Sequence, residues 1–264
     1  MKLFYRKFGK NNPVLIIVHG LYGASDNWVT QGKILSQYFE VYIIDQRNHG
    51  NSPHSSEHNY NVMSADIFEF MQDKSIKKAI LIGHSMGGKT VMTFAGKYPE
   101  MVLALIVVDI SPAKYEINNF SNSKIEKHKN IIEALNDKAI LQVKLREEAD
   151  KICKKYIDEP RTRAFILKNL KRANTGFKWK LNVETITKNI DNILSDVILK
   201  KDISGFPTLF IKAENSDYIT TKDIKLINNI FPTAEIKIIE NAGHWVHAEQ
   251  PKKFLETIFS FILE

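Results

Sequence analysis

Gly83, Ser85 and Gly87 have the spacing G-x-S-x-G, between the apolar run 79–82 and a helical pattern that begins at Met86. In this setting a serine stands on a sharp strand-to-helix turn, called a nucleophile elbow, with its hydroxyl clear of the backbone. The strained turn brings the two glycine positions close together, where a Cβ atom would collide with its neighbour. The spacing therefore predicts that Ser85 is a nucleophile for acyl transfer.

The same stretch also fits a second motif. Gly83, Gly88, Lys89 and Thr90 satisfy G-x-x-x-x-G-K-[ST], the phosphate-binding P-loop, which also follows a strand and opens a helix. A tight turn with no chemistry is a third and weaker interpretation. The local sequence does not decide between a nucleophilic serine and a nucleotide site, so the rest of the chain must.

A histidine that could activate Ser85 lies near the end of the chain. His244 follows the last expected strand, and acidic residues lie between it and Ser85, so the chain order is serine, acid, histidine. His244 and His247 could instead form a metal clip, but no third ligand has a matching spacing, and we expect no metal. Because a serine hydroxyl needs an adjacent base, we expect His244 to be that base.

Two loops that follow buried strands could contribute to the same site. The loop His19-Gly-Leu-Tyr-Gly23 could present backbone N–H groups to an oxyanion, although a plain tight loop fits equally well. The polar loop 45–52 follows the next strand. We expect Arg47 to bridge loops there, and we do not expect His49 to be the base.

Strands and helices alternate along much of the chain, which predicts an α/β fold with a mostly parallel, doubly wound sheet. Sites in such sheets lie outside the carboxyl ends of the strands, where His19, Asp45, Ser85 and Asp109 all fall. The expected strands are 3–8, 14–18, 40–44, 79–82, 103–108, 207–211 and 235–239. The expected helices run from 25 or 26 to 38, and over 61–73, 86–97, 221–231 and 251–263.

Residues 113–199 differ from the rest of the chain. Lys, Glu and Asn are more frequent, apolar residues recur at helical spacing, and no strand is expected. We therefore expect a core formed by residues 1–112 and 200–264, with a helical cap or lid, the cap segment (residues 113–199), inserted above the site. Phe177 and Trp179 are candidate pocket residues, although core packing is the more common role.

The composition is that of a globular protein. The chain has 264 residues, 44% hydrophobic and 25% charged, enough for one large domain with an insertion. The net charge is +7, but the lysines are scattered, so we expect no nucleic-acid partner. The single cysteine, Cys153, excludes an internal disulfide and fits a reducing compartment. Charges interrupt the first eight residues and no apolar run reaches about 18 residues, so we expect a cytoplasmic protein without a membrane span.

These motifs together resemble the α/β-hydrolases, and more closely their esterases of the bacterial YbfF type and the eukaryotic ABHD11 type. The resemblance spans nearly the whole chain in the family's order. The matching segments are 19–23, 45–53, 83–89, 109–112, 214–218 and 241–249. A P-loop protein has no use for the His19 loop or for His244, so the resemblance favours the hydrolase strongly.

The resemblance implies a role for each matching residue. Ser85 would be the nucleophile, His244 the general base, and the backbone N–H groups of Leu21 and Met86 the oxyanion hole. His19, Gly20 and His84 would support them. The acid is ambiguous: most α/β-hydrolases carry it in the loop where Ser216 and Asp217 lie, whereas the YbfF-like pattern implies Asp109 with Ser216 as a supporting hydrogen bond. We expect Asp109.

The function implied is a cofactor-independent serine esterase that cleaves small to medium acyl carboxylic esters, with thioesters also possible, through an acyl-enzyme. The expected partner is a small-molecule ester or thioester, and the expected state is a monomer or homodimer. The same fold hosts C–C hydrolases, perhydrolases and ligand-sensing receptors, so these remain alternatives.

Overall fold

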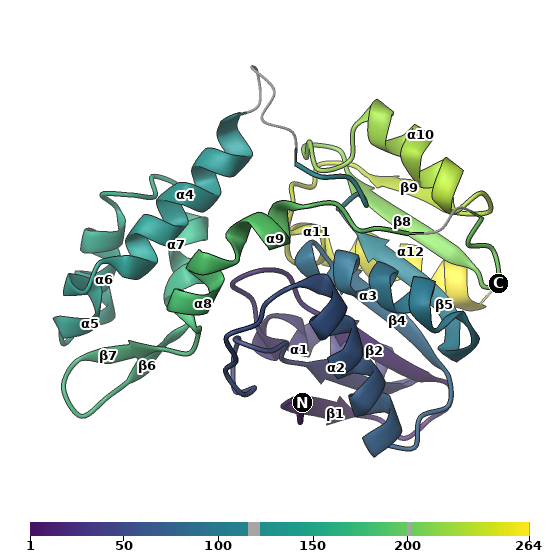
Figure 1. Ribbon diagram of the computed structural model, residues 1–264, viewed down its shortest axis with the longest axis horizontal. Coiled ribbons are helices and arrows are strands. Elements are labelled where there is room, and N and C mark those ends of the chain that lie inside the picture. The colour runs from purple at the N-terminus through teal and green to yellow at the C-terminus, as the bar shows by residue number, and fades with distance from the viewer. Residues whose placement is uncertain (116–121, 200–201, 264) are drawn as a thin grey trace.

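The architecture is a central seven-stranded sheet covered by helices on both faces, as a computed structural model of the chain shows (Figure 1). The structure describes residues 1–115, 122–199 and 202–263. The strand order is β1-β3-β2-β4-β5-β8-β9, and β1 alone runs antiparallel to its neighbour. The sheet consists of β1 (Tyr5–Phe8), β2 (Val14–Val18), β3 (Glu40–Ile44), β4 (Ala79–His84), β5 (Val102–Val108), β8 (Thr208–Ala213) and β9 (Glu235–Ile239). The predicted doubly wound sheet is confirmed.

The inner strands are continuous apolar runs because both of their faces are buried. Along β2, Ile16 and Val18 face one core while Leu15 and Ile17 face the other. The first core is covered by α2 (Tyr60–Asp73), α3 (Met86–Lys97) and α10 (Thr221–Ile230). The second core is covered by α1 (Val29–Leu35) and α12 (Pro251–Leu263).

Three one-turn helices complete this part: η1 (Ser25–Trp28), η2 (Pro99–Met101) and α11 (Val246–Glu249). The helix expected to start at Ser25 or Asp26 therefore begins as a 3₁₀ turn. At the start of this turn, the side chain of Asn27 accepts a hydrogen bond from the N–H of Ala24 at 2.8 Å. None of the described helices is both long enough and apolar enough to span a bilayer.

The cap segment lies to one side of the sheet (Figure 1). Its elements are α4 (Asn122–Asn136), α5 (Ala139–Gln142), α6 (Arg146–Cys153), α7 (Pro160–Leu167), β6 (Leu170–Arg172), β7 (Phe177–Trp179), α8 (Val183–Lys188) and α9 (Ile190–Leu194). The expectation that this segment contains no strand is wrong, because β6 and β7 form an antiparallel hairpin. Three-residue strands are too short to show a period of two.

The hairpin also contains the two aromatic candidates for the pocket, Phe177 and Trp179, which are the first and last residues of β7. Phe177 is buried, and Trp179 donates its indole N–H to the carbonyl of Leu135 at 3.0 Å. Neither residue lines the cavity described below. Of the two roles considered for Phe177 and Trp179, packing is therefore the one that the structure supports, and both side chains pack within the cap segment.

Candidate active site

Ser85 occupies the turn between β4 and α3 with φ 53° and ψ −121°, a left-handed conformation that a serine rarely adopts. The close contact expected between the two flanking glycines is present. A Cβ on Gly83 would lie 2.3 Å from the carbonyl oxygen of Gly87, and one on Gly87 would lie 2.2 Å from that of Val18. The elbow therefore requires glycine at both positions.

His244 forms a hydrogen bond from Nδ1 to Oδ2 of Asp109 at 2.8 Å. Asp109 is fully buried at the end of β5, and the N–H of Ala213 donates to its Oδ1 at 3.0 Å. The hydroxyl of Ser216 also donates to Oδ2. A carboxylate can only accept hydrogen bonds, so the Nδ1 of His244 carries the proton and Nε2 is left as a base.

Asp217, the alternative acid, has an exposed side chain on the loop after β8. The single Nδ1 proton of His244 goes to Asp109 instead. Ser216, which occupies the place where most α/β-hydrolases carry the acid, approaches the same carboxylate. The geometry thus brings together Ser216, Asp109 and His244.

Two contacts hold His244 in place, one on its ring and one on its backbone. The ring of Tyr218 stacks on it at a centroid distance of 3.8 Å and an angle of 14°. His84 hydrogen-bonds through Nε2 to the backbone carbonyl of His244 at 2.8 Å. Burial, with the neighbouring His244 and His247, holds the pKa of His84 well below 6.5, so its ring is neutral and Nε2 carries the donated proton.

The loop at residues 19–23 lies directly against the elbow. A Cβ on Gly20 would come within 2.9 Å of Nδ1 of His84 and 3.1 Å of Cβ of Ser85. His19 fixes this loop through two hydrogen bonds. Its Nδ1 bonds to the carbonyl of Gly20 at 2.8 Å, and its Nε2 accepts from the N–H of Gln46 at 3.0 Å. Leu21 follows and lines the cavity beside Ser85.

The polar loop after β3 is structural, as expected for Arg47. Its guanidinium binds both carboxylate oxygens of Asp66, at 2.6 and 2.8 Å. Asp45 accepts backbone N–H groups at 2.6 and 2.8 Å, and Nε2 of His49 accepts the N–H of Tyr22 at 3.2 Å. Neither Asp45 nor His49 lines the cavity.

Lys89, the lysine of the alternative P-loop motif, does not face the cavity. Its ammonium donates to the carbonyl of Ala113 at 2.7 Å and to that of Ser195 at 2.5 Å. The side chain is fully buried. A phosphate could not reach it, so the nucleotide interpretation is not supported.

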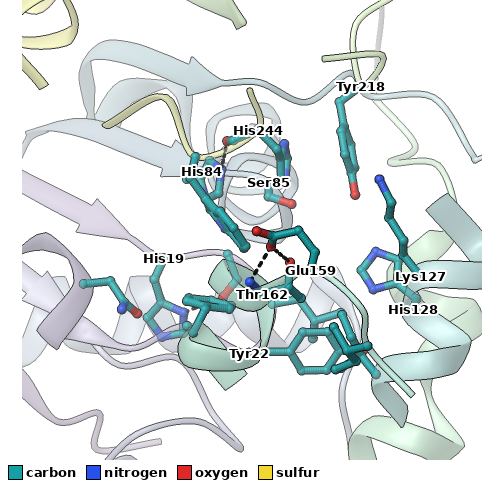
Figure 2. A pocket seen from close by; sticks show the side chains of 18 of the residues that line it. His19, Tyr22, His84, Ser85, Lys127, His128, Glu159, Thr162, Tyr218 and His244 are labelled. Carbon is teal, nitrogen blue, oxygen red and sulfur yellow. Dashed lines mark hydrogen bonds between the residues drawn. The ribbon is translucent and has the colours of Figure 1, made fainter. Parts of the chain in front are cut away.

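A cavity of about 450 Å³ opens in front of Ser85 and His244 (Figure 2). Lys127 and His128 of α4 lie across it from Ser85, and Glu159 turns its carboxylate back to Thr162, at 2.5 Å from the backbone N–H and 2.7 Å from the hydroxyl. The apolar part of the wall comes from both the core and the cap segment. These residues include Trp28, Ile131, Ile157, Phe165 and Trp245.

Sequence reasoning missed most of this wall. Phe165 and Ile131 are apolar residues on helices, and an apolar side chain that faces a cavity has the same spacing as one that faces the core. Two signals were available. Trp245 directly follows His244, and His128 is a polar residue within an otherwise apolar helical stripe.

The buried histidines predict an acid-sensitive fold. Burial and the neighbouring His244 lower the pKa of His247 to about 3, while burial, with Arg47 and His19, lowers that of His58 to about 4. Because these folded-state values lie below 6.5, the unfolded chain binds more protons under acidic conditions, and the free energy of unfolding falls as the pH drops from about 6.5 toward 3. At about 1.4 kcal/mol per pKa unit, His247 alone contributes up to roughly 5 kcal/mol to this loss.

We expect the melting temperature of wild type to fall steeply between pH 7 and pH 4.5, and that of His247→Phe to fall less. Phenylalanine retains the aromatic stack that His247 makes on Trp28, at a centroid distance of 3.9 Å, but does not titrate. His54→Gln is the control, because His54 is exposed. Parallel melting curves for wild type and His247→Phe across this pH range would contradict the assignment.

Comparison with known proteins agrees with the fold. The family model for the alpha/beta hydrolase fold matches residues 13–251. A mouse protein named sn-1-specific diacylglycerol lipase ABHD11 is 34% identical over 95% of this chain and 81% of its own length. Esterase YbfF of Escherichia coli is 31% identical, covering 96% of this chain and 94% of its own. The solved structure of a marine microorganism esterase superposes with a TM-score of 0.93 and 46% identity, over 99% of each chain.

Proposed function

The chain belongs to the alpha/beta hydrolase fold family, and we propose that this member is a carboxylic-ester hydrolase in which Ser85, His244 and Asp109 form a catalytic triad. The observation that carries the proposal is the 2.8 Å hydrogen bond from Nδ1 of His244 to the buried Asp109, beside a strained serine at the wall of a cavity. The esterase and lipase names of its relatives support the same reaction class.

The first half of the reaction forms the acyl-enzyme. Nε2 of His244 removes the proton from the hydroxyl of Ser85 as Oγ attacks the ester carbonyl carbon. Asp109 holds the imidazole in the tautomer that leaves Nε2 free, and it stabilises the imidazolium that forms. His244 then returns the proton to the departing alcohol.

The oxyanion of the tetrahedral intermediate needs hydrogen-bond donors on the side of Ser85 away from His244. Met86 is the first residue of α3, so its N–H has no carbonyl partner within that helix. The N–H of Leu21, in the loop that lies against Ser85, is the second proposed donor. Such donors typically contribute roughly 10²-fold to 10³-fold each to the rate.

Water activated by His244 completes the cycle by attacking the acyl-enzyme.

The cavity supports a small to medium acyl group. Its volume of about 450 Å³ lies within the usual range for small-molecule sites, and its apolar wall includes Ile131, Ile157 and Phe165. We propose that esters are cleaved and that thioesters of similar acyl groups are accepted, because the attack on the carbonyl carbon is the same. No step of this mechanism calls for a cofactor.

Hydrolysis of p-nitrophenyl esters from acetate to decanoate tests this proposal. We expect multiple turnover without any partner protein, an optimum at short to medium acyl chains, and covalent labelling of Ser85 by a fluorophosphonate. Slow single turnover with ligand-induced stabilisation would instead indicate a receptor. No turnover of any ester, with no labelling, would overturn the assignment of Ser85.

A further inference from the structure

Lys89 carries a contact that the proposed mechanism does not use. It lies on α3 four residues after Ser85, and its backbone N–H donates to the carbonyl of Ser85 at 3.2 Å. Its side chain is fully buried, and its ammonium bonds to the carbonyls of Ala113 and Ser195. One side chain therefore connects the helix that begins at the elbow to two distant stretches of chain.

Those two stretches are the ends of the cap segment. Residues 112–115 lead into it and residues 193–197 lead out of it. They are bonded to each other, since the N–H of Tyr115 donates to the carbonyl of Leu194 at 3.0 Å and that of Val197 to the carbonyl of Pro112 at 2.9 Å. We refer to these two paired stretches as the stem. Lys89 donates one hydrogen bond to each side of the stem.

The ammonium of Lys89 is buried among aromatic rings, which has a cost in free energy. Burial lowers the pKa of its ammonium to about 7, while Asp196 and Asp223 act in the opposite direction. The rings of Tyr115 and Tyr60 lie 4.8 and 5.8 Å from Nζ. Burying an ammonium costs free energy that an apolar residue of similar size would not. What Lys89 supplies in return is a pair of hydrogen-bond donors that reach both sides of the stem.

The position of the stem matters for the cavity. Across the cavity from Ser85, the wall is built by cap-segment residues such as Ile131, Ile157 and Phe165, which are joined to the core through the stem. Other contacts hold the cap segment elsewhere, among them Asn169 to the carbonyl of Tyr22 at 2.8 Å. Because the stem and these wall residues belong to one segment, we expect a displacement of the stem to shift the cap-segment part of the wall relative to α3.

We propose that Lys89 is a positioning residue that fixes the cap-segment wall of the acyl pocket relative to Ser85 by donating hydrogen bonds to both sides of the stem. This inference rests on the proposed function for its kinetic readout. It predicts that Lys89 acts on the binding of long acyl groups, which reach the wall, and hardly on short ones. The chemistry at Ser85 itself is left unchanged.

The test compares Lys89→Met and Lys89→Gln with wild type and with Lys97→Met. Lys97 is an exposed lysine on the same helix, so it is a matched control. For p-nitrophenyl octanoate we expect Lys89→Met to raise KM at least 10-fold, with a smaller change in kcat. For the acetate ester, kcat/KM and the rate of labelling by a small fluorophosphonate should stay within about 3-fold of wild type.

Hydrogen exchange gives a readout that does not depend on esterase activity. The amides of Tyr115 and Val197 should be protected in wild type and exchange at least 10-fold faster in Lys89→Met, which has no donor, while the amides within α3 stay protected. Fast exchange of these stem amides in wild type would overturn the proposal without any variant. If wild type cleaves no ester but the exchange result holds, the proposed function fails and the role of Lys89 in holding the stem stands.

Two kinetic outcomes would also overturn the inference. Octanoate and acetate kinetics of Lys89→Met that match those of wild type would show that the hydrogen bonds do not position the wall. An equal loss of kcat on both esters, with slower labelling of Ser85, would show that Lys89 acts on the elbow rather than on the cap segment.

Discussion

Ser85→Ala is expected to lower kcat for p-nitrophenyl ester hydrolysis by about 10⁴-fold to 10⁶-fold, because it removes the hydroxyl that forms the acyl-enzyme in the proposed mechanism. The proposed oxyanion donors and the pocket remain in this variant, so a small rate above that of water should persist. Alanine keeps the Cβ atom of residue 85, so the packing of the elbow against the loop at Gly20 is unchanged. The melting temperature should therefore stay close to that of wild type, which initial rates and a thermal melt together would establish.

Ser64→Ala is the control for this experiment. Ser64 is a buried serine on α2 that lies outside the cavity, so its loss should leave kcat within about 2-fold. Fluorophosphonate labelling should disappear in Ser85→Ala and persist in Ser64→Ala. Ester turnover by Ser85→Ala above about 1% of the wild-type rate would mean that another residue or a different mechanism carries the reaction.

Local sequence was enough to predict the elbow because the five-residue pattern has glycine at both positions where a Cβ would collide, once within the turn and once with Val18 of β2. Gly83 and Gly87 are required by contacts of 2.3 and 2.2 Å that any Cβ would make, and a G-x-S-x-G pattern records that requirement directly. The same stretch also matched the P-loop pattern. What separates the two interpretations is where the Lys89 side chain goes, and that depends on residues 113 and 195, far away in the sequence.

The acid and the pocket wall could not be predicted from local pattern for the same reason. Asp109 and Asp217 both follow strands of the sheet, and their spacing to His244 does not say which carboxylate turns toward the imidazole. The family resemblance favoured Asp109, and the hydrogen bond to His244 agrees with that expectation. The wall residues Phe165 and Trp245 come from segments that meet only after the chain has folded.

Ser85 and Asp109 share an unusual backbone conformation, with φ of 53° and 48°. Each lies at the carboxyl end of an inner strand, on β4 and β5, which pair in parallel. Positive φ at non-glycine residues costs roughly 1–3 kcal/mol each and persists only where the surroundings enforce it. Here the neighbouring strands hold both residues, since Ser85 donates its N–H to Val108 and Asp109 donates its N–H to Ile211.

Asp109→Asn is expected to lower kcat by about 10³-fold to 10⁴-fold. The carbonyl oxygen of the new amide can still accept from the N–H of Ala213, which leaves the NH₂ group facing His244. An NH₂ group donates, so Nδ1 of His244 must become the acceptor and the proton moves to Nε2. The imidazole then presents a proton to Ser85 instead of a lone pair, and it can no longer act as the base. Steady-state kinetics and the rate of fluorophosphonate labelling should fall together.

Two neighbouring substitutions distinguish this explanation from general damage to the loop. Asp217→Asn changes an exposed carboxylate one residue from Ser216, and we expect kcat within about 3-fold of wild type. Ser216→Ala removes one donor to the ionised Asp109, and a loss of about 10-fold fits the strength of a hydrogen bond to a charged group. If Asp217→Asn lost 10³-fold while Asp109→Asn lost little, the acid would be Asp217, and the hydrogen bond between His244 and Asp109 would have only a structural role.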